Sequence, residues 1–158
     1  VCAAGNNGPR EGTISPLGIS RKVITVGCHE GGYFGARMDL CENYSGRGSR
    51  DMLYRKPDIV APGTDIISCN VQCRGNYRSG FRNAYIKKSG TSMATPFVSG
   101  SAALMMEWGI VRGNDAFLYG EKVKAYMIRG ARHLAGINEY PSELAGWGAL
   151  CLRESIPR

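Results

Sequence analysis

The chain has 158 residues, a hydrophobic fraction of 43% and a formal net charge of +7, from 20 Lys and Arg against 13 Asp and Glu. This length fits one domain or a large part of one, and the composition excludes a disordered chain. The apolar runs are far shorter than the roughly 20 residues of a membrane-spanning helix. The cations are scattered, with a mild excess between residues 47 and 88, and lack the clustering with aromatics that nucleic-acid binding favours. We therefore expect a globular domain with a solvated basic surface, and neither a membrane nor a nucleic acid as partner.

The first half of the chain has the pattern of short strands. Apolar runs at 1–5 (VCAAG) and 22–27 (KVITVG) predict buried parallel strands, because their apolar residues do not alternate with polar ones. The stretch between them is rich in Gly, Pro, Ser and Asn and predicts a loop. Residues 57–63 and 64–69 predict a further strand with a Pro-Gly turn, and the polar stretch 70–85 predicts a hairpin or surface excursion.

The second half has helical spacing. Residues from Thr91 to Trp108 are compatible with a helix and carry apolar side chains three or four positions apart. A second helix is predicted from about Gly120 to Arg129, with Gly130 as its C′ residue after a basic last turn. The tail, 140–157, predicts a turn, a short strand and a partial helix. The whole pattern predicts an α/β fold with a mostly parallel sheet flanked by helices.

Six cysteines lie along the chain: Cys2, Cys28, Cys41, Cys69, Cys73 and Cys151. Cys2 and Cys28 fall in apolar strand-like runs, where buried free thiols are common. Cys69 and Cys73 form a close pair, but no histidine or second pair completes a zinc site. We interpret most of these cysteines as reduced, which favours an intracellular or anaerobic setting.

Ser92 stands at the predicted start of the first helix. There the helix dipole and free backbone N–H groups would stabilise the oxyanion that a nucleophilic serine generates. Pro96 is expected in the first turn, where N–H groups have no intrahelical partner. The small residues Gly100, Ala102 and Ala103 are expected to let the helix pack closely in a core. The structural alternative is that Thr91 and Ser92 only cap the helix, as Ser and Thr before a helix commonly do.

Asn6 directly follows the first predicted strand, at the end where α/β folds place active sites. Its side-chain amide can donate to an oxyanion, although Asn-Asn-Gly by itself is a common turn. Four motifs in this order, at 3–8 (AAGNNG), 44–48 (YSGRG), 56–66 (KPDIVAPGTDI) and 90–96 (GTSMATP), closely resemble the C-terminal half of the subtilisin-like serine proteases, the subtilases or peptidase S8 family. The tail resembles the clostridial-type bacterial branch, which is similar to the subtilases that process spore-germination proteins.

The resemblance implies the C-terminal part of a subtilisin-like three-layer fold and an endopeptidase that hydrolyses polypeptide substrates. Ser92 matches the nucleophile that forms the acyl-enzyme. Asn6 matches the side-chain donor of the oxyanion hole, which the backbone N–H of Ser92 completes. Four further residues match the substrate-binding strand that walls the P1 pocket and the neutral rim of that pocket: Ala3, Ala4, Gly5 and Asn7.

The acid and base of the catalytic triad precede the asparagine segment in this family. We therefore expect residues 1–158 to be the C-terminal half of a catalytic domain whose N-terminal half, with the Asp and His, is absent. Without a base the chain alone is expected to be inactive. His29 is expected in a surface loop leading away from the site and His133 beyond a helix end, so neither is expected to act as the base. Asp58 and Asp65 belong to structural segments of the family pattern.

Three further expectations concern partners and metals. The absent half would cover a parallel-sheet edge and apolar helix faces, so the chain alone is expected to self-associate. No carboxylate cluster is present, so no cofactor is expected in this chain, whereas the full-length protein could hold the structural calcium common in subtilases. The alternative function is that of a pseudoprotease, a subtilase-like scaffold for binding or signalling, for example in spore germination.

Overall fold

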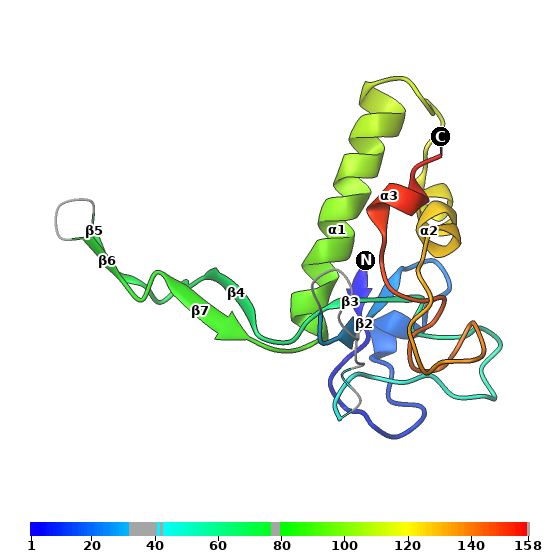
Figure 1. Cartoon of the computed structure of the whole chain (residues 1–158), viewed down its shortest axis with the longest axis horizontal. Coiled ribbons are helices and arrows are strands. Elements are labelled where there is room, and N and C mark those ends of the chain that lie inside the picture. The colour runs from blue at the N-terminus through cyan, green and yellow to red at the C-terminus, as the bar shows by residue number, and fades with distance from the viewer. Residues whose placement is uncertain (32–40, 42, 77–79, 158) are drawn as a thin grey trace.

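The computed structural model describes residues 1–31, 41, 43–76 and 80–157. At its centre β1 (Cys2–Ala3), β2 (Thr25–His29) and β3 (Ile59–Pro62) form a parallel sheet in the order β1-β2-β3 (Figure 1). All five residues of β2 are buried, as expected for the middle strand of a covered parallel sheet. The predicted parallel strands are confirmed.

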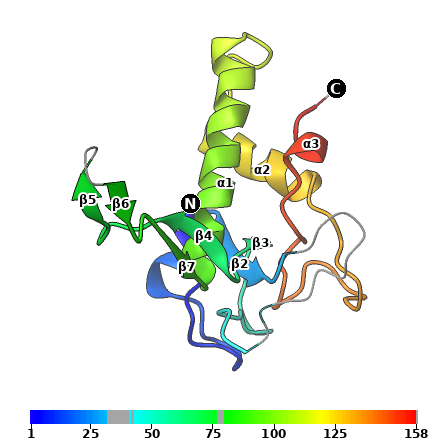
Figure 2. The same cartoon turned by 60° about the vertical axis from the view of Figure 1, so that its left-hand side comes forward.

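The two faces of the sheet are covered by different parts of the chain. Successive side chains of a strand point to opposite faces. Ile59 therefore joins the core formed with α1 (Thr91–Met106) and α2 (Gly120–Arg129), whereas Val60 packs into a smaller cluster with residues 134–149. Figure 2 shows α1 standing over the sheet with α2 beside it. The predicted α/β class, a parallel sheet flanked by helices, is confirmed.

The remaining elements of the body are short. They are η1 (Pro16–Ile19), a π-helical segment η2 (Glu107–Val111) that continues α1, and α3 (Leu152–Ser155). Ala149 bridges both Val60 and Arg132, which confirms a short extended segment before the final helix. No helix in the described ranges is long and apolar enough to cross a membrane.

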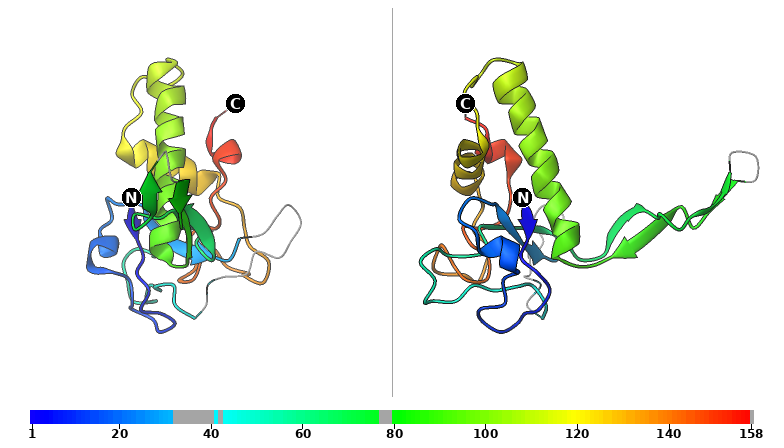
Figure 3. Two further views of the ribbon diagram at one scale, coloured as in Figure 1. Left: turned by 90° about the vertical axis from the view of Figure 1, so that its left-hand side faces the viewer. Right: turned by 180° about the vertical axis from the view of Figure 1, so that it is seen from behind.

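A narrow antiparallel arm leaves this body (Figures 1 and 3). Its base is the pair β4 (Ile66–Cys69) and β7 (Tyr85–Lys88), and its outer part is the pair β5 (Arg74–Asn76) and β6 (Gly80–Arg82). The predicted hairpin is confirmed. The strand predicted at 64–69 also forms, but as part of the arm.

One expectation for α1 is wrong and a second holds only in part. The helix begins at Thr91, so Pro96 is its sixth residue and lies inside the helix. A proline there has no N–H to donate to the carbonyl four residues earlier, which is that of Ser92. Of the three small residues expected to pack in a core, Ala102 packs against it, whereas Gly100 and Ala103 are exposed.

The glycine that ends α2 has a different role from the one expected. Gly130 has φ −88°, an ordinary right-handed conformation rather than the left-handed one of a typical C′ glycine. A Cβ atom on Gly130 would overlap the backbone of Ser155. Glycine at this position therefore permits the close approach of α3.

The interpretation of Cys28 as a free thiol is wrong. Cys28 in β2 forms a disulfide with Cys41. The backbone already holds the two residues together, because the Cys41 N–H donates to the Cys28 carbonyl at 3.2 Å. The other four cysteines are free, as expected for most of the six: Cys2, Cys69, Cys73 and Cys151.

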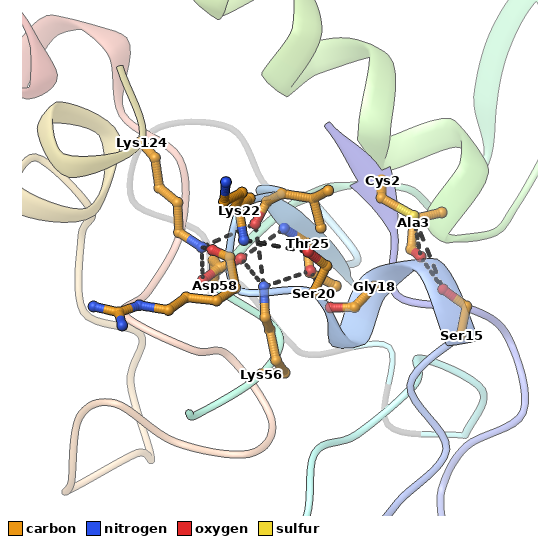
Figure 4. A network of polar contacts seen from close by, with 12 residues as sticks. Cys2, Ala3, Ser15, Gly18, Ser20, Lys22, Thr25, Lys56, Asp58 and Lys124 are labelled. Atoms are coloured by element: carbon orange, nitrogen blue, oxygen red, sulfur yellow. Dashed lines mark hydrogen bonds and ion pairs between the residues drawn. The ribbon is translucent and has the colours of Figure 1, made fainter. Parts of the chain in front are cut away.

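A buried ionic network occupies the amino end of the sheet (Figure 4). Asp58 accepts hydrogen bonds from the Thr25 N–H and the Lys56 ammonium, both at 2.7 Å, and pairs with Lys124 at 2.8 Å. Lys56 is 1% exposed and also donates to the Val23 carbonyl and the Thr25 hydroxyl. Burial lowers the pKa of the Lys56 ammonium, and the hydrogen bond to Asp58 opposes that shift. The network joins β2, β3 and α2.

Candidate active site

Ser92 is the second residue of α1 and its side chain is exposed. The hydroxyl lines a cavity of about 390 Å³ together with Ile67 and Phe97. Neither the hydroxyl nor the backbone N–H of Ser92 forms a hydrogen bond with any described residue. Gly90 occupies the N-cap position and no side chain caps the helix, so the capping alternative is wrong. Ser92 therefore presents a free hydroxyl and a free N–H at the positive end of a helix.

The side chain of Asn6 is fixed beside this helix start. Its Oδ1 accepts from both the backbone N–H and the hydroxyl of Thr91, each at 3.0 Å. A backbone N–H can only donate, so the amide atom that faces it must be the oxygen. The Nδ2 group has no partner among the described residues and remains available as a donor.

Thr91 is the residue that sequence reasoning missed. It is 0% exposed, and its hydroxyl accepts from the Gly5 N–H at 3.2 Å while donating to Asn6. One buried hydroxyl thus connects the end of β1 to the start of α1. The available signal was a threonine directly before the candidate nucleophile, a position that the sequence alone could explain as a cap.

Two glycines bring the helix start to the sheet. Gly90 has φ +147° and donates its N–H to the Gly63 carbonyl at 2.8 Å, and Gly63 donates to the His29 carbonyl at 3.0 Å. A Cβ atom on Gly90 would lie 3.2 Å from Nδ2 of Asn6. Any larger residue would crowd the amide that Thr91 orients.

The loop carrying Asn6 is held on both sides by the segment 44–48. The Gly5 carbonyl accepts from the Gly46 N–H at 2.8 Å, and the Gly8 N–H donates to the Tyr44 carbonyl at 3.0 Å. This segment therefore restrains the backbone immediately before and after the two asparagines.

Several backbone groups of the predicted substrate-binding strand already form hydrogen bonds within the chain. Ser15 donates its hydroxyl to the Ala3 carbonyl and its N–H to the Ala4 carbonyl, both at 2.7 Å. The N–H of Ala4 donates to Val26 at 2.8 Å, and both backbone groups of Gly5 are engaged as described above. Asn7, at the predicted pocket rim, is exposed. The roles of these residues toward substrate remain predictions.

The expectation that His29 lies in a surface loop is wrong. His29 is the last residue of β2 and only 4% exposed, and its Nδ1 accepts from the Gly31 N–H at 3.0 Å. Burial lowers the pKa of this imidazole to about 4. His133 is exposed and stacks on Tyr140 with 3.9 Å between ring centroids. In the described part of the chain neither histidine forms a hydrogen bond with Ser92.

The two aspartates of the motif at 56–66 are engaged elsewhere. Asp58 belongs to the buried network, and Asp65 pairs with Lys87 at 3.2 Å on the surface. Within the residues that the structure covers, no three His, Cys, Asp or Glu side chains gather as a potential metal site.

Comparison with known sequences gives a consistent set of relatives. A sequence model of a protein family, described as the subtilase family, matches residues 1–148. The serine protease AprX of Bacillus subtilis is 41% identical over 165 aligned positions, which cover 99% of this chain and 35% of AprX. Proteinase R of Parengyodontium album is 38% identical over 117 positions, covering 74% of this chain and 24% of that protein. The chain thus spans about a third or less of the length of these relatives.

Comparison with solved structures also finds proteases. The CspB protease of Clostridium perfringens superposes with a TM-score of 0.74 at 40% identity, over 92% of this chain and 28% of CspB. The prenylagaramide maturation protease PagA superposes with a TM-score of 0.69 at 27% identity, over 97% of this chain and 47% of PagA. The match to a clostridial protein agrees with the resemblance expected from the tail.

Proposed function

This chain belongs to the subtilase family, whose relatives here are serine proteases, and we propose that Ser92 is the nucleophile of a subtilisin-type endopeptidase. The observation that carries the proposal is the pair of unpartnered donors at the start of α1. The N–H of Ser92 has no partner among the described residues, and Nδ2 of Asn6 is turned to donate because Thr91 holds the amide oxygen. Two such donors form the arrangement that stabilises a tetrahedral oxyanion.

The proposed reaction follows from this geometry. The Ser92 oxygen attacks the scissile carbonyl carbon and loses its proton to a histidine, and the carbonyl oxygen gains negative charge. The Ser92 N–H and the Asn6 amide donate to that oxygen. The amine departs with the proton from the histidine, and water then hydrolyses the acyl-enzyme to regenerate Ser92.

We propose that the histidine and its aspartate come from polypeptide outside these 158 residues. The two histidines of this chain are engaged elsewhere, one buried with a depressed pKa and one stacked on Tyr140. The chain alone is then inactive toward peptide bonds. Calcium in the assembled enzyme would have its ligands mainly in that additional polypeptide.

An uncovered apolar surface supports a partner of this kind. Phe97 and Leu104 lie one and three turns along α1 on the side away from the core, and Leu104 is 53% exposed. β1 has a neighbour on only one side in the described sheet. We propose that the N-terminal half of the catalytic domain covers both surfaces. A monomer by light scattering at micromolar concentration would contradict self-association of the chain alone.

A fluorophosphonate probe tests the proposed nucleophile. The 158-residue chain is expected to resist labelling, whereas a chain extended upstream to include the Asp and His segments is expected to label stoichiometrically at Ser92. The Ser92→Ala variant of the extended chain is the control. Absence of labelling in a folded extended chain would favour the pseudoprotease alternative, and stoichiometric labelling of the short chain would contradict the need for an external base.

A further inference from the structure

We propose that β4 and β7, named here the ribbon, bind an extended acidic segment of the polypeptide substrate as an added β-strand. This inference rests on the proposed function and deepens it by naming the class of substrate. It depends on three independent features of the ribbon: its connection to Ser92, its open edges and its charge.

The ribbon leads directly to the nucleophile. β7 ends at Lys88, and the chain then passes through Ser89 and Gly90 into α1. The cavity beside Ser92, about 390 Å³, shares three lining residues with a second cavity of about 210 Å³. The shared residues are Ile66, Ser68 and Met93. The second cavity lies over one face of the ribbon, against Met93 of α1, and therefore adjoins the cavity beside Ser92.

The edges of the ribbon are open. β4 and β7 pair only with each other among the described strands, so each has one edge without a neighbour. Ile67 is 66% exposed and Tyr85 69% exposed, although both are apolar over most of their surface. A two-stranded ribbon is marginally stable in water, and a third strand supplies both hydrogen bonds and apolar contacts.

The positive charge of the arm favours an acidic peptide as the bound strand. Residues 66–88 contain five cations and no acidic residue. At the ribbon, Lys87 has Asp65 as a partner at 3.2 Å, whereas Lys88 has no ion pair with a described residue. Lys87 and Lys88 are consecutive residues of β7 and point to opposite faces of the ribbon. An acidic side chain on either face of the added strand would therefore lie near a lysine and gain electrostatic steering.

A polypeptide fits these features better than a nucleic acid does. Open strand edges offer alternating N–H and C=O groups at the spacing of another peptide backbone. A nucleic acid would use the cations but would leave those backbone groups without partners. The two occupants differ in whether backbone hydrogen bonding contributes to affinity.

The first test measures peptide binding to the 158-residue chain by fluorescence anisotropy. A labelled peptide that alternates Glu and Val is compared with peptides in which Gln or Lys replaces Glu. We expect the Glu peptide to bind at least about tenfold more tightly than the Gln peptide, and its affinity to fall with added salt. Equal affinity for the Glu and Gln peptides would overturn the proposal.

Charge reversal on the ribbon locates the site. The double variant Lys87→Glu, Lys88→Glu is expected to lose at least about tenfold in affinity for the Glu peptide. The matched control, Arg10→Glu with Arg153→Glu, makes the same change in net charge at exposed positions outside the arm. Equal losses in both double variants would show that only overall charge matters and would contradict the proposal.

Backbone methylation distinguishes an added strand from a polyanion. Two Glu-Val peptides are N-methylated at alternate residues, one at odd and one at even positions. Because alternate N–H groups of a strand point to opposite sides, only one of the two peptides should lose binding. Unchanged binding of both, with full competition by single-stranded DNA, would identify a general polyanion surface and overturn the proposal.

The outcomes separate this inference from the proposed function. Peptide binding requires no chemistry and is measured with Ser92→Ala, so it is independent of fluorophosphonate labelling. Binding without labelling of the extended chain would retain the ribbon site and reject the nucleophile. Labelling without ribbon binding would retain the nucleophile and reject the ribbon site.

Discussion

The polar groups at the two ends of the parallel sheet differ in whether they have hydrogen-bond partners within the protein. At the amino end Asp58 has three donors and Lys56 three acceptors, all inside the protein. At the carboxyl end the Ser92 N–H, its hydroxyl and the Asn6 Nδ2 have no partners among the described residues. Groups with a full set of internal partners hold a fold together, whereas fixed groups without partners are available to a ligand. The difference distinguishes a structural cluster from a candidate catalytic one.

The largest expected effect is at the amino end. Asp58→Ala leaves the buried Lys56 and the largely buried Lys124 without their common anion, so we expect a loss of about 3–5 kcal/mol in the free energy of unfolding. Urea denaturation measures it. The control Glu154→Ala removes an exposed partner of Arg132 at 3.8 Å and should cost less than about 1 kcal/mol. Similar losses for both variants would contradict the structural role of the network.

At the carboxyl end a substitution should lower kcat more than it lowers stability. In subtilisin, loss of the oxyanion-hole asparagine lowers kcat by about 10²–10³. Under the role proposed for Asn6, we expect a similar loss for Asn6→Ala in the assembled enzyme. Asn6→Ala removes the acceptor of the Thr91 N–H and hydroxyl but leaves no buried charge unpaired, so it should change the free energy of unfolding less than Asp58→Ala does. Peptide hydrolysis and denaturation are measured on the same preparations. A large loss of stability with unchanged kcat would show that Asn6 has a structural role rather than a catalytic one.

The carboxyl end also contains one buried titratable group. The pKa of His29 is lowered from 6.5 to about 4 by burial, so between these pH values the unfolded chain binds a proton that the folded chain excludes. The free energy of unfolding should therefore fall as the pH drops from about 6.5 to about 4, by roughly 3 kcal/mol from this group.

The variant His29→Gln separates this contribution from that of the carboxylates. The free energy of unfolding of the chain with His29, minus that of the variant, should be constant above pH 6.5 and should fall as the pH drops below it. A constant difference throughout would show that His29 titrates normally in the folded chain.

The smallest expected effect concerns Thr91, which links β1 to α1. Thr91→Val leaves the Gly5 N–H without its acceptor and should cost about 1–3 kcal/mol of stability. It also removes one of the two donors that orient Asn6, so kcat of the assembled enzyme should fall as well. Thr91→Ser keeps the hydroxyl and should restore kcat. Failure of serine to restore it would assign the effect to packing of the threonine methyl group.

The sequence was sufficient to predict the architecture because its local patterns agree with the fold. Unbroken apolar runs predicted the parallel strands, and apolar spacing predicted both long helices, α2 with its observed bounds. The errors concern properties set by distant contacts. The strand β2 continues beyond Gly27, where the apolar run ends, to the buried His29, and Cys28 pairs with Cys41, 13 positions away.

For the candidate site, the motifs identified Ser92 and Asn6 but not how they are held. The role of Thr91 depends on β1 and α1 being adjacent, and no local pattern encodes that adjacency. The predicted helix start at Thr91 is the observed one, and it makes Pro96 the sixth residue of α1, beyond the first turn in which it was expected. Sequence therefore indicated the candidate reacting groups, and the structure supplied the contacts that hold them.

The bond between Thr91 and Asn6 has a consequence for folding. The two residues are 85 positions apart, so their hydrogen bonds form only after β1 and α1 have docked. Contacts of such long range assemble slowly and late, because much of the chain must be ordered first. A partly folded chain has no oriented amide beside Ser92. Under the proposed function, the catalytic geometry would therefore form only when the fold is complete and the backbone of the chain itself is no longer an accessible substrate.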